Sequence, residues 1–124
     1  MTQQDAPTGG CALDLDTALE NLDGDTDLLR EVAEMFVEIG PDQLAEIEAF
    51  IAAGDAPAVA TSAHGMKGGA SNLGAVEFVR AALDLELLSK AGSLDGAVER
   101  LAAMRAAFVR LRDQLDVLDW NDLA

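Results

Sequence analysis

One histidine, His64, stands in the segment AHGMKGGASNLGA, which begins at residue 63, and it is the only imidazole in the chain. A free imidazole titrates near a pH of about 6.5, so at neutral pH one ring nitrogen offers a lone pair for attack on phosphorus or a carbonyl. Lys67 follows one helical turn later, where an ammonium could hold the oxyanions of a transferred group. The pair indicates nucleophilic group transfer at a helix surface.

Small side chains share the helix face of His64, because residues three and four apart stack on one face. A glycine inside a helix lowers helix stability by about 1 kcal/mol relative to alanine. The three glycines that follow His64 therefore indicate that this segment needs small residues for another reason. We expect that reason to be close approach of a partner to the imidazole. The surface expected to receive the partner consists of Ala60, Thr61, Gly65, Gly68 and Ser71.

Glu86 is predicted to reach the imidazole from the next helix. In an antiparallel hairpin that turns at about Gly74, residues equidistant from the turn lie level, and His64 is ten residues before it and Glu86 twelve after it. The carboxylate could accept a hydrogen bond from the ring N–H that is not used for attack, which would fix the tautomer. An ordinary surface carboxylate is the alternative.

The elements that would position these side chains are all helices. Apolar spacing and capping residues predict a short helix within residues 14–24, then long helices over about 25–53, from the Asp55 cap to Asn72, over 76–91, and from a Ser93 cap to about 118. Gly40-Pro41 should kink the first long helix or divide it, and we favour one kinked helix. Short connections predict an all-α fold, an antiparallel four-helix bundle with a short additional N-terminal helix.

Each long helix has an apolar stripe that should face the core. On the helix of His64 the stripe lies opposite the imidazole, which should leave the ring exposed. Met35 and Met104 are expected to fill gaps between helices. The stripes of the last three helices are Val59, Ala63, Met66, Ala70 and Leu73; Val76, Val79, Leu83, Leu87 and Leu88; and Leu94, Val98, Leu101, Met104, Phe108, Leu111, Leu115 and Leu118.

The segment AHGMKGGASNLGA resembles the signature of the histidine-containing phosphotransfer (HPt) domains of bacterial phosphorelays. That signature is Ala-His, a spacer, an apolar residue, Lys-Gly, small residues and Leu-Gly-Ala. The similarity extends from LDLDTALENLDGD at residues 13–25 through the helix with Pro41 to Leu85-Glu86. Met66 stands where leucine is usual, and Gly65 and Gly69 replace larger residues.

This resemblance implies a phosphocarrier that takes a phosphoryl group onto His64 from the aspartate of a receiver domain and passes it reversibly to another. The partners would be response regulator receiver domains and a hybrid sensor histidine kinase. By the same resemblance, Lys67 would bind the phosphoryl oxygens, Gly68 would leave room for the receiver, and Glu86 would orient the imidazole. The chain would have no ATP site and no cofactor, the divalent metal being held by the receiver.

Charge and composition exclude several other classes. The 124 residues carry 23 acidic and 8 basic side chains, a net charge of −15, which disfavours nucleic acid and anionic membranes as partners. No phosphate-loop motif, metal-ligand spacing or catalytic triad pattern is present. The chain shows no signal peptide pattern, and its single cysteine, Cys11, cannot form an internal disulfide, so a cytoplasmic location is expected.

Two further expectations concern domains and function. Residues 1–12 are expected to be a disordered N-terminal lead, and residues 13–124 a single helical bundle domain. The alternative function is a helical adaptor of the same fold that binds a receiver or another signalling protein without carrying phosphate. The sequence leaves open whether the C-terminal DWNDLA packs on the bundle.

Overall fold

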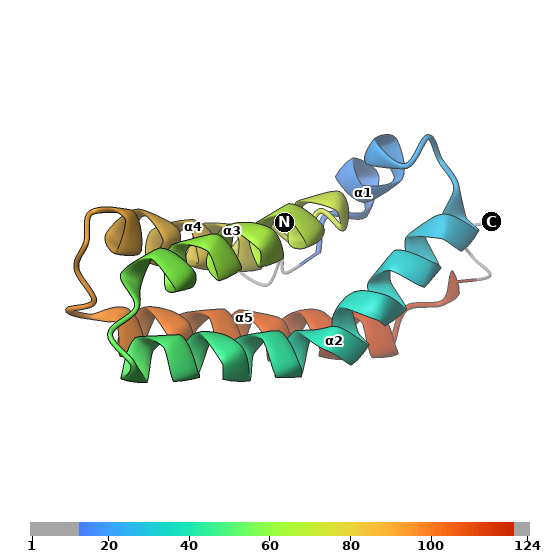
Figure 1. Cartoon of the computed structure of the whole chain (residues 1–124). Coiled ribbons are helices and arrows are strands. Elements are labelled where there is room, and N and C mark those ends of the chain that lie inside the picture. Colours follow the sequence, from blue (N-terminus) through green and yellow to red (C-terminus); the bar gives the residue numbers. More distant parts are fainter. Residues whose placement is uncertain (1–12, 121–124) are drawn as a thin grey trace, which may run out of the picture.

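The computed structural model describes residues 13–120, which form helices and contain no strand (Figure 1). The predicted N-terminal lead, with Cys11, and residues 121–124 lie outside this range. Within residues 13–120, no helix combines the length and the apolar character that a bilayer crossing requires. In chain order the helices are α1 (Leu15–Asn21), α2 (Thr26–Ala52), α3 (Ala56–Asn72), α4 (Val76–Lys90) and α5 (Ala97–Asp116).

The four long helices form a bundle, with α3 and α4 beside each other and α2 and α5 packed below them in the view of Figure 1. Only three residues separate α2 from α3 and α3 from α4, so these neighbours run antiparallel. The predicted all-α bundle with a short additional N-terminal helix is confirmed.

Helix α1 is attached to the turn between α3 and α4. The backbone N–H of Asp14 donates to the carbonyl of Gly74 at 2.7 Å, and Nδ2 of Asn21 donates to the carbonyl of Ser71 at 3.2 Å. Gly74 has a φ of +64°, and a Cβ there would overlap the Asp14 carbonyl. Only glycine fits this turn without strain, because it tolerates positive φ and has no side chain. The hairpin that carries the site is fixed at its closed end.

Aspartate side chains begin three of the helices. Asp14, Asp25 and Asp55 accept hydrogen bonds from the backbone N–H three residues later, at 3.2, 3.0 and 3.1 Å. Such caps satisfy N–H groups that have no partner within the helix and place negative charge at its positive end. The Asp55 cap starts α3 at the predicted place.

The start of the last helix was predicted too early. Ser93 does not cap it, since α5 begins at Ala97 after Gly96, which has a φ of +86°. The Ser93 hydroxyl instead accepts a hydrogen bond from the Asp95 N–H at 3.2 Å within the preceding turn. As a result Val98 lies in the first turn of α5 and is exposed, contrary to prediction, while Ala97 is buried.

Helix α2 is one continuous helix that contains Pro41, as predicted, and Figure 1 shows it bent along its length. Proline lacks the N–H that would bond to the Val37 carbonyl, so the helix can bend there without breaking. Gly40 precedes it and is buried against α5. A Cβ at Gly40 would overlap the ring of Phe108, so the two helices approach too closely for any side chain here.

Three phenylalanines from three helices form the centre of the core. The ring centroids lie 5.3 Å apart for Phe36 and Phe78, 5.7 Å for Phe36 and Phe108, and 6.4 Å for Phe78 and Phe108. These distances and tilted geometries are favourable for aromatic pairs. The predicted core face of α3 is confirmed, and Met104 is fully buried. Trp120, after α5, also packs partly buried against this core.

On α4 the predicted apolar stripe is partly wrong. Val76, Leu83 and Leu87 are exposed, and Phe78 and Leu85 are buried in their place. Helix α4 carries apolar side chains on more than one face, so periodicity did not identify the face that packs. Burial of Phe78 and Leu85 turns Glu86 inward toward α3, which determines the site.

We expect Gly40→Ala to lower the free energy of unfolding by about 1–3 kcal/mol, because the Phe108 ring must move to admit the methyl group. Chemical denaturation measures this change. Gly65→Ala is the matched control, since a Cβ there meets no atom within 4 Å. It should keep or raise stability by up to about 1 kcal/mol. Equal stability of Gly40→Ala and the wild type would contradict the packing described.

Candidate functional site

His64 lies on α3 with its imidazole facing outward, and its side chain is 65% exposed. The opposite face of α3 is buried through Val59, Ala63 and Met66. Packing of that face sets the rotation of the helix and so the direction of the ring. The prediction that the imidazole would be exposed is confirmed.

Glu86 on α4 is the partner of the ring, although its own side chain is only 3% exposed. Its Oε2 lies 2.9 Å from Nδ1 of His64, and its Oε1 accepts from Nζ of Lys67 at 2.7 Å. Nζ of Lys90, one turn along α4, lies 3.2 Å from Oε2. The predicted contact between Glu86 and the imidazole is present, and the carboxylate is a buried centre that joins three side chains.

These contacts keep the carboxylate ionised. The Lys67 hydrogen bond is the main cause that lowers the Glu86 pKa from 4.5 to about 2, against the opposing effect of burial. Hydrogen bonds from Lys90 and His64 lower this pKa further. An ionised carboxylate can only accept hydrogen bonds, so Nδ1 of His64 must be the donor. In the neutral ring the lone pair is therefore on Nε2, the nitrogen not bound to Glu86.

Lys67 lies one turn from the imidazole on α3, and its ammonium is bound to Glu86, a contact that the sequence reasoning did not predict. Its side chain is 24% exposed, and its stem crosses from α3 to α4. Lys90 was missed by the sequence reasoning. The available signal was its spacing, because a lysine four residues after a glutamate on a helix regularly meets it.

The proposed partner surface is exposed at most of its predicted positions. Thr61, Gly65, Gly68 and Ser71 are exposed, and a Cβ at Gly65 or Gly68 would meet no atom within 4 Å. Internal packing therefore does not require either glycine. Ala60 is an exception, since it is buried.

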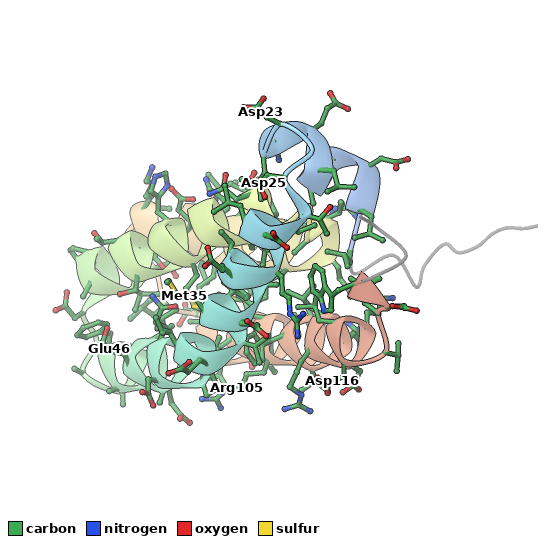
Figure 2. All side chains as sticks on the ribbon, turned by 90° about the vertical axis from the view of Figure 1, so that its right-hand side faces the viewer. Asp23, Asp25, Met35, Glu46, Arg105 and Asp116 are labelled. Carbon is green, nitrogen blue, oxygen red and sulfur yellow. The ribbon has the colours of Figure 1, made fainter. Side chains whose placement is uncertain are left out.

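A shallow apolar groove of about 190 Å³ lies beside the histidine helix, between α2 and α3. Met35 on α2 is 60% exposed at this groove, so the prediction that it fills a gap in the core is wrong. Figure 2 shows Met35 on the α2 surface next to α3. The sequence reasoning noted Gly65 and Gly69 but did not predict this groove. The two glycines are four residues apart on α3, and Met35 and Ile39 line the groove with the same spacing on α2. The lining residues are Val32, Met35, Phe36, Ile39, Gln43, Gly65, Met66 and Gly69.

Comparisons with known proteins show the family to which this chain belongs. The family model of the Hpt domain matches residues 31–119, and the chain therefore belongs to this family, which performs histidine phosphotransfer in phosphorelays. A crystal structure of histidine-containing phosphotransfer protein B from Pseudomonas aeruginosa PAO1 is similar, with a TM-score of 0.79 and 28% identity. The match covers 86% of this chain and 92% of that one. Among curated proteins, none matches significantly.

The Glu86 pKa predicts a specific dependence of stability on pH. Because the folded value of about 2 lies below the ordinary 4.5, ionised Glu86 stabilises the fold fully above 4.5 and loses this effect as the pH falls toward 2. We expect the unfolding free energy of the wild type, minus that of Glu86→Gln, to be constant above a pH of about 5 and to decrease below it. Urea denaturation from pH 7 to 3 measures this difference in unfolding free energy. The contributions of the other carboxylates are the same in both proteins and cancel. Parallel pH profiles would contradict the buried ion pair.

Proposed function

We propose that His64 is the residue that accepts and donates the phosphoryl group, through Nε2. The observation that carries this proposal is the 2.9 Å contact of Nδ1 with the buried, ionised Glu86 carboxylate. It assigns the proton to Nδ1 and leaves the lone pair on the nitrogen that can face a partner. The ring is held in one orientation while its side chain remains 65% exposed.

The transfer step follows from this arrangement. The Nε2 lone pair attacks phosphorus of an aspartyl phosphate on the receiver, and an N–P bond forms. The bond between phosphorus and the aspartyl oxygen breaks, and its electron pair leaves with the carboxylate. The ring retains its Nδ1 proton and becomes positively charged, which Glu86 stabilises through the same hydrogen bond. Reversal of these steps returns the group to an aspartate.

Lys67 assists by contact with the phosphoryl oxygens, and this requires its ammonium to leave Oε1 of Glu86. His64 and Lys67 lie one turn apart on α3, so both side chains can reach the same bound phosphoryl group. The receiver supplies the divalent metal that neutralises the remaining charge. This chain would then need neither a cofactor nor an ATP site and would act as a phosphocarrier in the cytoplasm.

The receiver docks over α3 and the groove beside it. Exposed Thr61, Gly68 and Ser71 leave the imidazole accessible, and Met35 and Ile39 offer apolar surface on α2. An apolar centre with a polar surround is typical of protein interfaces. Response regulators and a hybrid sensor kinase are the partners that this surface would serve.

His64→Gln should abolish phosphoryl acceptance while receiver binding persists, because glutamine has no nucleophilic imidazole. The measurement is acid-labile, base-stable label on the protein after incubation with a phosphorylated receiver, with binding measured separately by calorimetry. Equal label on both proteins would exclude His64 as the acceptor. Binding with no label on the wild type, from several competent donors, would favour the adaptor function.

Gly68→Leu should block the transfer by obstructing the receiver, without unfolding the helix. Leucine is a better helix former than glycine by roughly 1 kcal/mol, and open space surrounds this position, so thermal stability should be kept or raised. Initial rates of label transfer should fall by roughly tenfold or more, as a loss of at least about 1.4 kcal/mol of complementarity implies. A matched Ala103→Leu variant, which places leucine at an exposed position of α5, should retain the rate. Unchanged transfer by Gly68→Leu would contradict docking at this face.

A further inference from the structure

Lys67 and Lys90 are the only lysines in the sequence, and both bind the same buried carboxylate. They come from different helices and use different oxygens: Lys67 from α3 bonds Oε1, and Lys90 from α4 bonds Oε2. Oε2 is also the oxygen that contacts His64. The site thus contains one carboxylate and two ammonium groups beside the imidazole ring.

We propose that Lys90 is a positioning residue that holds Glu86 in place when Lys67 moves to the phosphoryl group. This inference rests on the proposed function of His64. When Lys67 leaves, Oε1 loses its partner, and a carboxylate that is only 3% exposed would lose its main counter-charge. A buried charge without a partner is strongly unfavourable. Without Lys90, that penalty would keep Lys67 on Glu86 and away from the phosphoryl oxygens.

The arrangement of contacts on the two oxygens lets Lys67 leave Glu86 without reorientation of the carboxylate. Because Lys90 and the imidazole share Oε2, both contacts persist when Oε1 is vacated. The carboxylate stays ionised and fixed, and the Nδ1 proton remains on the ring. Lys90 is 62% exposed and one turn from Glu86 on the same helix, so its contact is independent of Lys67.

A double-mutant cycle with Glu86→Gln tests this role, because a neutral amide does not need a second cation. Lys90→Ala should slow phosphoryl acceptance from a phosphorylated receiver by at least about threefold when Glu86 is present, and by less than about 1.5-fold in the Glu86→Gln background. Lys90→Arg should restore most of the rate. Arg80→Ala removes a positive charge from the exposed face of the same helix and should leave the rate unchanged.

Equal slowing in both backgrounds would mean that Lys90 contacts the phosphoryl group or the receiver directly, and it would overturn the inference. An unchanged rate for Lys90→Ala would also overturn it, while the proposed function would stand. Failure of the wild type to accept label from competent donors would remove the proposed function itself, and this inference with it.

A spectroscopic measurement distinguishes the two lysines directly. Lysine labelled with 13C at Cε should give two side-chain signals in this chain, which Lys67→Arg and Lys90→Arg assign by loss of one signal each. After phosphorylation with phosphoramidate, a small phosphoryl donor, the Lys67 signal should shift more than the Lys90 signal. A larger shift at Lys90 would show that Lys90, rather than Lys67, moves to the phosphoryl group.

Discussion

The buried carboxylate of Glu86 is the interaction on which the site depends. It joins α3 to α4, fixes the proton on Nδ1 of His64, and binds the ammonium of Lys67. In the proposed mechanism it releases Lys67 when a phosphoryl group arrives. A lone buried carboxylate would be unstable, and the two ammonium groups and the ring N–H that surround it reverse that effect and lower its pKa to about 2. The Glu86 carboxylate therefore both stabilises the packing of α3 on α4 and sets the tautomer of His64.

The rest of the fold keeps α3 and α4 in the register that this contact needs. The close approach of Asp14 to Gly74 attaches α1 to the hairpin turn, and the ring of Phe78 anchors α4 against α2 and α5. A displacement of one residue along α4 would move Glu86 by about 1.5 Å and rotate it by about 100° about the helix axis, away from the imidazole. Core packing at Phe78 and Leu85 prevents this rotation.

Sequence reasoning predicted most of the helices and the contact of His64 with Glu86, because periodicity and capping are local and a short turn imposes the hairpin register. The prediction of buried residues failed where a helix has apolar side chains on two faces and only one of these faces packs against the core. On α4, Leu83 and Leu87 are as apolar as the residues that are buried. Met35 is equally apolar, yet it lies exposed at the groove between α2 and α3. The spacing of Lys90 from Glu86 predicts their contact, but the burial of Glu86, which gives that contact its importance, is indicated by no local pattern.

The distribution of charge explains how an acidic protein can carry phosphate. With a net charge of −15, most of the surface repels a phosphoryl group. Both lysines of the chain meet at Glu86, so the site has a local excess of one positive charge beside the imidazole. A neutral amide in place of Glu86 would leave two cations close together with no acceptor of opposite charge between them. The carboxylate thus lets two ammonium groups lie near one histidine, and in the proposed mechanism one of them binds the transferred group.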